Sequence, residues 1–182
     1  MSSDDRATVR IGILSVSDRA SRGVYADLGG PAIERWLAAA ITTRWTPLRR
    51  VIPDGAEAVR DALVALCDAE GADLVLTTGG TGPAPRDLTP EGTRAAITRE
   101  MPGFGEAMRR ASLEAVPTAI LSRQTAGVRG TTLIVNLPGR PAAIDTCLAA
   151  VFPAIPYCLA LIGAGRIETD PRIVASFRPP SG

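Results

Sequence analysis

The sequence predicts an α/β fold in three layers: an open, mostly parallel sheet with helices on both of its faces. Short apolar runs alternate with segments of helical periodicity along the chain, and no internal repeat or low-complexity segment interrupts them. Strand, helix and strand at this spacing favour parallel pairing through right-handed crossovers. The 182 residues suit one domain over 1–182, with a disordered N-terminus at 1–8 and a C-terminal tail at 166–182.

Four short runs rich in aliphatic residues are predicted strands, because polar or glycine-rich residues bound each of them. They cover residues 9–16, 47–52, 74–78 and 131–137. Open parallel sheets bind ligands beyond the carboxyl ends of their strands, so we expect the following loops to meet at one edge of the sheet. These loops are 15–19, 52–54, 77–86 and 136–140.

Helical periodicity fills the intervals between these strands. Ile33, Leu37 and Ala40 fall on one helical face, for example, and Pro31 is a favoured first residue of that helix. The predicted helices cover 31–40, 58–70, 103–114 and 141–151, and one more begins at Thr89.

Residues 146–165 carry no charge and match a membrane span in length. The segment contains Pro153 and Pro156 and is rich in alanine, which disfavours a single membrane-spanning helix. We expect a helix that is buried or lies at a subunit interface, with a break near Pro153. Residues 1–10 are polar, which predicts no secretory leader.

The composition excludes several kinds of chemistry. The chain has no histidine, and all 20 basic residues are arginine. Triads with histidine, histidine metal sites, Schiff-base lysines and the lysine of P-loops are therefore excluded. The net charge of +1 gives no indication of nucleic-acid binding or of a membrane surface. Cys67, Cys147 and Cys158 lack close spacing, which predicts buried, reduced thiols in a cytoplasmic protein.

The turn 77–82 (TTGGTG) directly follows the predicted strand 74–78. Glycine permits positive φ and close backbone approach, so successive N–H groups can surround an anion. A tight turn that needs glycine for its geometry alone is an equally good interpretation. The turn lacks the spacing of the common dinucleotide and P-loop motifs.

Two carboxylates, Asp54 and Asp87, lie in loops of this predicted edge. If they reach the same place they could hold Mg²⁺, which takes few protein carboxylates together with substrate phosphates. The alternative is that Asp54 caps the next helix and Asp87 caps the helix that begins at Thr89. With no histidine and no cysteine cluster, an oxygen-liganded cation is the only metal that the sequence suggests.

Ser17, Asp18 and Arg19 follow the first predicted strand and offer a hydroxyl and a guanidinium for phosphate, although Asp18 and Arg19 could equally be a solvated surface pair. Further candidates on loops could each be a surface residue. They are Arg86, Ser122, Arg123 and Arg140. The edge as a whole suggests a phosphate-bearing ligand and a transfer catalysed by positioning and charge neutralisation.

Several segments, in the same order, resemble one known family. They are 15–19 (SVSDR), 23–25 (GVY) with Asp27, 52–54 (IPD), 76–83 (LTTGGTGP), 86–90 (RDLTP), 100–106 (EMPGFGE), 119–123 (AILSR) and 136–139 (NLPG) with Pro141. The chain thus resembles the molybdopterin adenylyltransferases of molybdenum cofactor biosynthesis over nearly its whole length. The stand-alone bacterial enzymes are more similar than the fused domains of plants and animals.

The resemblance implies a cytoplasmic homotrimer with a molybdopterin-binding fold. Such a protein binds Mg-ATP and molybdopterin, transfers AMP to the terminal phosphate of the pterin and releases pyrophosphate. Asp54 and Asp87 match the essential aspartates of the family, as catalytic residues and ligands of Mg²⁺. The residues implied to bind substrate or nucleotide are Ser17, Asp18, Arg19, Thr78, Gly79, Gly80, Thr81, Gly82, Ser122, Arg123, Pro138 and Gly139.

One departure and three alternatives accompany this interpretation. The segment after Cys147 is shorter than the bacterial pattern, which affects trimer contacts and partner docking more than the active site. A non-catalytic molybdopterin carrier or scaffold, a molybdate-insertion enzyme and a general nucleotide-binding module are the alternatives. We expect a possible handover of product to a molybdate-insertion enzyme, and no nucleic-acid or membrane partner.

Overall fold

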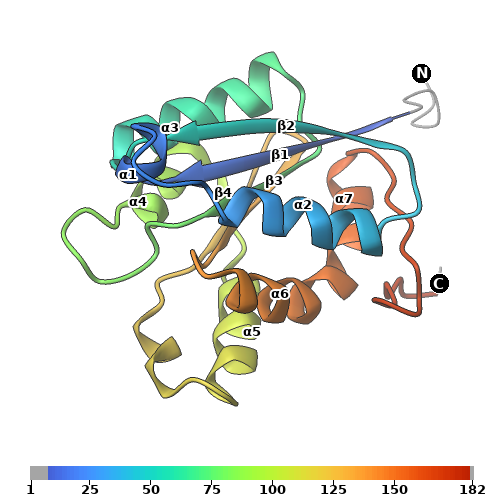
Figure 1. Ribbon diagram of the computed structural model, residues 1–182. Coiled ribbons are helices and arrows are strands. Elements are labelled where there is room, and N and C mark those ends of the chain that lie inside the picture. Colours follow the sequence, from blue (N-terminus) through green and yellow to red (C-terminus); the bar gives the residue numbers. More distant parts are fainter. Residues whose placement is uncertain (1–7, 181–182) are drawn as a thin grey trace.

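The computed structural model describes residues 8–180, which form a six-stranded sheet with helices on both faces (Figure 1). The order of the strands is β2-β1-β3-β6-β5-β4. Four parallel strands are β1 (Val9–Val16), β2 (Trp45–Ile52), β3 (Leu74–Thr78) and β6 (Thr132–Leu137). The predicted three-layer, mostly parallel α/β fold is therefore confirmed. The expectation for residues 1–7 lies outside the described part of the chain.

Each face of the sheet has its own core, because side chains of a strand alternate between the faces. On one face, Leu74 and Leu76 of β3 join the buried side chains of four helices. These are α2 (Gly29–Ala40), α5 (Pro102–Leu113), α6 (Pro141–Val151) and α7 (Ile155–Ile162). On the other face, Val75 packs with α3 (Ala56–Val64), its π-helical continuation η1 (Ala65–Ala69) and α4 (Thr89–Ala96). Figure 1 shows α3 and α2 on opposite sides of the strands.

The antiparallel edge of the sheet was not predicted. β5 (Ala126–Arg129) pairs antiparallel with β6, and β4 (Arg99–Glu100) pairs antiparallel with β5. These strands are short and β4 is exposed, so neither gives a pattern of alternating apolar residues. The short helices α1 (Asp18–Ser21) and η2 (Pro117–Leu121) were missed for the same reason of length.

The uncharged segment forms two α-helices, α6 and α7, joined by the 3-10 turn η3 (Phe152–Ala154). The predicted break near Pro153 is confirmed. By length and composition alone the stretch Pro141–Ile162 could cross a membrane, but half of its most apolar part is buried inside the molecule. Phe152, for instance, is fully buried, with its ring centroid 4.9 Å from that of Trp36. These contacts are those of core helices.

Part of the predicted tail is packed against the domain. Thr169 pairs with Ile41 in an isolated bridge, and the amide of Asp170 donates to the carbonyl of Ala40 at 2.8 Å. Val174 is buried in the core on the α2 face. The chain after α7 therefore covers the carboxyl end of α2.

Candidate active site

A cavity of about 380 Å³ lies at the carboxyl ends of the parallel strands. Each of the four parallel strands is followed by a residue that lines it: Ser17 after β1, Asp54 after β2, Gly79 after β3 and Gly139 after β6. Asp87 lines the same cavity. The structure thus brings the four predicted loops and both candidate carboxylates together.

Asp54 is joined to the loop after β1 by a reciprocal pair of hydrogen bonds. The amide of Asp18 donates to Oδ2 of Asp54 at 3.2 Å, and the amide of Asp54 donates to Oδ1 of Asp18 at 3.1 Å. Helix α3 begins after Gly55, with no side-chain hydrogen bond at its first turn. The helix-cap interpretation of Asp54 is therefore wrong, and its carboxylate borders the cavity.

Asp87 closes a turn within its own loop. Its Oδ2 accepts a hydrogen bond from the amide of Ala84 at 3.1 Å, and its amide donates to the carbonyl of Ala84 at 2.9 Å. A Cβ on Gly82 would lie 2.7 Å from Oδ2, so this carboxylate packs directly on the glycine. Leu88 precedes α4 without a side-chain cap, so Asp87 does not cap that helix either.

Gly79 and Gly80 have φ of +94° and +64°, which L side chains rarely adopt. A Cβ on Gly79 would lie 2.4 Å from the carbonyl oxygen of Val16, and one on Gly80 would lie 2.4 Å from Oγ1 of Thr89. Thr89 also donates from Oγ1 to the carbonyl of Gly79 at 2.9 Å. The turn therefore needs glycine at both positions for its geometry, and both glycines line the cavity.

Other predicted residues divide between this cavity and its surroundings. Those that line it are Ser17, Thr78, Gly79, Gly80 and Gly139. Those outside its lining are Asp18, Arg19, Thr81, Gly82, Ser122, Arg123 and Pro138. Ser122 and Arg123 line a separate polar cavity of about 310 Å³. The carbonyl of Pro138 accepts a hydrogen bond from Oγ1 of Thr78 at 2.8 Å, which ties the loops after β3 and β6 together.

Several lining residues were not among the predicted site residues. Asp27 caps α2: its Oδ1 accepts from the amide of Gly29 at 3.0 Å, and its Oδ2 accepts from Ser15 Oγ at 2.6 Å. An aspartate a few residues before Pro31, with only Leu28, Gly29 and Gly30 between them, is a helix-start signal that could have found it. Tyr25 lies within 2.9 Å of Ser17 through their hydroxyl oxygens, whereas nothing in the sequence marks that contact.

Arg86 and Arg140 also line the cavity, which the sequence left open as surface positions. In contrast, the three cysteines are buried, as predicted. Burial raises the pKa of the Cys67 thiol to about 11, so it stays protonated near neutral pH. The cavity therefore presents carboxylates, hydroxyls, backbone amides and guanidinium groups rather than a thiolate nucleophile.

The fold and the cavity define an α/β protein whose candidate ligand site lies at the carboxyl edge of a parallel sheet. A sequence model of one family, described as a probable molybdopterin binding domain, matches residues 12–157, and the chain belongs to this family. The resemblance seen in the sequence segments is thereby confirmed.

Individual relatives agree with the family assignment. The molybdopterin adenylyltransferase of Escherichia coli K12 is 50% identical over 186 residues, which cover 96% of this chain and 95% of the relative. That of Helicobacter pylori J99 is 49% identical over 172 residues, covering 94% and 98%. A molybdopterin biosynthesis enzyme, MoaB, from Thermus thermophilus superposes with a TM-score of 0.80 at 44% identity, covering 88% of this chain and 99% of that structure.

Proposed function

We propose that this chain is a molybdopterin adenylyltransferase, which transfers AMP from ATP to the terminal phosphate of molybdopterin and releases pyrophosphate. One observation carries the proposal: Asp54, Asp87 and the glycine turn at 79–80 line a single cavity at the ligand-binding edge of the sheet. The names of relatives that are half identical to this chain support the same activity.

The reaction needs no protein nucleophile. An oxygen of the pterin phosphate forms a bond to the α-phosphorus of ATP, and the bond from that phosphorus to the bridging oxygen breaks, with its electron pair leaving on pyrophosphate. This chain positions the two substrates and stabilises negative charge. Arg86 and Arg140 are the guanidinium groups that line the cavity, and the turn at Gly79 and Gly80 brings backbone there.

Asp54 and Asp87 suit a magnesium ion that is bound jointly with ATP. Each carboxylate accepts a hydrogen bond from a backbone amide, and no arginine among residues 8–180 forms an ion pair with either of them. Within residues 8–180, no group of three or more His, Cys, Asp or Glu side chains could enclose a metal ion. Two carboxylates completed by phosphate oxygens match the way proteins hold Mg²⁺. When bound, the ion would neutralise charge on the triphosphate and on the departing pyrophosphate.

The proposal includes a homotrimer in the cytoplasm and handover of the product to a molybdate-insertion enzyme, without a nucleic-acid or membrane partner. The segment after Cys147, which the resemblance gives as shorter than in the bacterial enzymes, completes α6 and continues through η3 into α7. Of the three elements only Pro141, at the start of α6, lines the cavity. The departure therefore bears on subunit contacts rather than on the proposed chemistry.

Pyrophosphate release from ATP, measured anaerobically with and without Mg²⁺ and molybdopterin, tests the function. We expect release that needs the pterin, the metal and Asp87, so that the folded Asp87→Asn variant loses most of this activity. Pterin binding without release would indicate a carrier, and a molybdenum-bearing product without AMP would indicate an insertion enzyme. ATP hydrolysis in the absence of pterin would indicate a general nucleotide-binding module.

A further inference from the structure

We infer that Arg123 is a positioning residue for the proposed reaction: it fixes the loop that carries Asp87 onto α4 and so places the Asp87 carboxylate at the cavity. The family resemblance implies that Arg123 binds substrate or nucleotide directly. The structure gives its guanidinium a different set of partners. The inference rests on the proposed function for its kinetic readout only.

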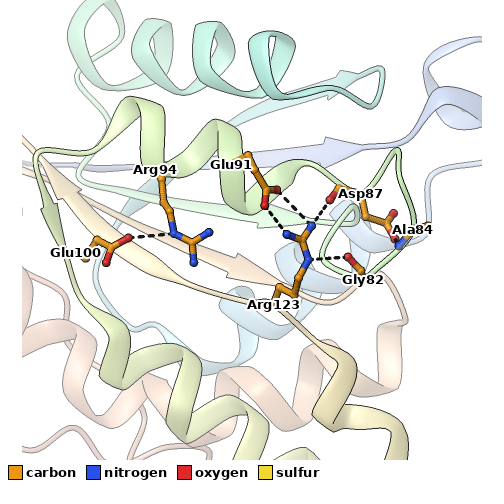
Figure 2. A network of polar contacts seen from close by, with 7 residues as sticks. All are labelled: Gly82, Ala84, Asp87, Glu91, Arg94, Glu100 and Arg123. Carbon is orange, nitrogen blue, oxygen red and sulfur yellow. Dashed lines mark hydrogen bonds and ion pairs between the residues drawn. The ribbon is translucent and has the colours of Figure 1, made fainter.

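Figure 2 shows Arg123 at the centre of a polar network that ends on the Asp87 loop and on α4. Its Nε donates to the carbonyl of Gly82 at 2.9 Å, and Nη2 donates to the carbonyl of Asp87. Nη1 and Nη2 both donate to the carboxylate of Glu91, the latter at 3.2 Å. The backbone amide of Arg123 also donates to the carbonyl of Thr81 at 2.9 Å. One residue therefore bonds to both ends of the segment 82–87.

These partners occupy four donor contacts of a guanidinium that has five N–H groups. Arg123 is not among the residues that line the cavity with Asp54 and Asp87. Its planar fork spans two carbonyls and one carboxylate at once, which the single point charge of a lysine does not reproduce. The group acts on the loop rather than on the ligand.

The loop depends on outside support because its own residues are exposed. Pro83, Ala84, Pro85 and Arg86 are all exposed. The side chain of Asp87 accepts a hydrogen bond from the amide of Ala84, which belongs to the same loop. The position of the carboxylate is thus set by the loop, and the two carbonyl bonds from Arg123 set where the loop lies.

Glu91 is the carboxylate partner of Arg123, and the two side chains form an ion pair. Burial on its own would raise the pKa of Glu91, but the hydrogen bonds from Arg123 and from its own backbone, with the positive charges of Arg123 and Arg94, outweigh burial and lower that pKa. Near neutral pH the pair is therefore ionised. An ionised carboxylate fixes the guanidinium in the plane from which it reaches both carbonyls.

The chain offers a matched control at the other end of α4. Arg129 donates to the carboxylate of Asp68 at 2.9 and 2.6 Å and to the carbonyl of Ala96 at 2.8 Å. Like Arg123, this arginine combines an ion pair with a carbonyl bond, here to Asp68 of η1 and to Ala96 at the end of α4. Its partners lie outside the lining of the cavity, so Arg129→Ala removes an equivalent anchor without touching the Asp87 loop.

The experiment compares Arg123→Ala, Arg123→Lys and Arg129→Ala in the full chain. Hydrogen exchange is followed at the hydrogen-bonded amides of Ala84 and Asp87, and pyrophosphate release is measured over ranges of ATP and Mg²⁺. In Arg123→Ala we expect faster exchange in the loop, kcat lower by roughly 10-fold to 100-fold, and a weaker Mg²⁺ response. The KM for ATP should change less than kcat, and Arg123→Lys should restore only part of the rate. Arg129→Ala should keep the wild-type loop exchange and kcat.

Unchanged exchange in Arg123→Ala would overturn the inference, as would wild-type kcat despite a mobile loop. Equal kcat losses in Arg123→Ala and Arg129→Ala would also overturn it, because they would show a general loss of stability. If the wild-type chain releases no pyrophosphate, the proposed function fails instead. Loop exchange still decides in that case, since it reports whether Arg123 holds the loop without any turnover.

Discussion

The two ends of the same sheet use carboxylates in different ways. At the amino end Asp73, which is 1% exposed, accepts hydrogen bonds from the amide of Arg10 at 2.9 Å and from the amide of Gly165 at 2.7 Å. Those bonds join β1 and the segment after α7 to the start of β3. At the carboxyl end Asp54 and Asp87 are only partly buried, and each accepts its bond from a neighbouring loop amide at the border of a cavity.

The difference shows what separates a structural carboxylate from one that can bind a ligand. A fully buried carboxylate is tolerated because backbone amides satisfy it on both oxygens, and it stabilises the fold. A carboxylate at a cavity, with lone pairs left for a ligand, can take a cation or orient a substrate. Substitutions at the carboxyl end should therefore lower turnover, and substitutions at the amino end should lower the free energy of unfolding.

The largest effect is expected for Asp54→Asn, which removes one negative charge at the cavity and keeps the shape and an acceptor oxygen for the amide of Asp18. Turnover should fall by roughly 100-fold to 1000-fold, the loss typical of removing one preorganised electrostatic group. The urea midpoint should stay near that of the wild type. Steady-state pyrophosphate release and urea unfolding are the measurements, and normal turnover in the folded variant would remove Asp54 from the mechanism.

Asp73→Ala should show the opposite pattern. Two backbone amides lose their acceptor, and that of Gly165 is buried whereas that of Arg10 is only partly buried. An uncompensated buried group costs about 1–3 kcal/mol, so the free energy of unfolding should fall by at least about 1 kcal/mol. The remaining folded fraction should turn over at a rate near that of the wild type. Urea unfolding with activity per folded molecule measures both, and a stable but inactive variant would contradict the division between the two ends.

Gly80→Ala tests whether the glycine turn is as constrained as its contacts indicate. Alanine in a left-handed conformation costs about 1–2 kcal/mol, and the added Cβ must also displace Thr89. We expect lower stability together with lower turnover, because the displaced residue begins α4 beside the Asp87 loop. Gly103→Ala is the control, since nothing lies within 4 Å of a Cβ at this position in α5. An unimpaired Gly80→Ala protein would show that the turn adapts.

The parallel half of the sheet could be predicted from the sequence because its central strands are buried on both faces. β1 and β3 were predicted with their observed bounds, since both are mostly apolar, as strands buried on both faces of a sheet require. β4 and β5 could not be predicted from their own residues. β4 has two residues and β5 has four, with Gly127 among them, so neither shows a strand pattern. Their conformation depends on the pairing of β5 with β6 and of β4 with β5. The meeting of the four loops at one edge could also be predicted, because the carboxyl ends of parallel strands lie at the same edge of a sheet.

The partners of individual site residues could not be predicted in the same way. Arg123 and Asp87 are 36 positions apart in the chain, so their contact depends on how the segment after η2 lies against α4 and the loop before it. The reciprocal bonds of Asp18 and Asp54 span the same separation of 36 positions. Periodicity and turn chemistry describe neighbours in the chain, whereas these bonds are tertiary.

The smallest effect is expected for Glu91→Gln. It sharpens the comparison because Glu91 lies in the first turn of α4, outside the cavity lining, and is the α4 partner of Arg123. The pKa of Glu91 lies below its ordinary value in the folded chain, since its hydrogen bonds outweigh the opposing effect of burial. A lowered pKa means that the charged form stabilises the fold at pH above the ordinary value, and that this contribution is lost as the pH falls through the lowered one. The pair is 37% exposed on both sides, so it should contribute no more than about 1 kcal/mol.

Urea unfolding of the wild type and of Glu91→Gln, between about pH 6 and about pH 3, measures this contribution. The wild type should be the more stable at the higher pH, and the difference should shrink toward the lower pH as Glu91 becomes protonated. Added salt should reduce the difference at the higher pH, because exposed charges are screened. A difference that stays constant with pH would show that the Gln side chain disturbs packing instead. The position of the Asp87 loop would then depend on the hydrogen bonds from Arg123 to the loop carbonyls rather than on the ion pair with Glu91.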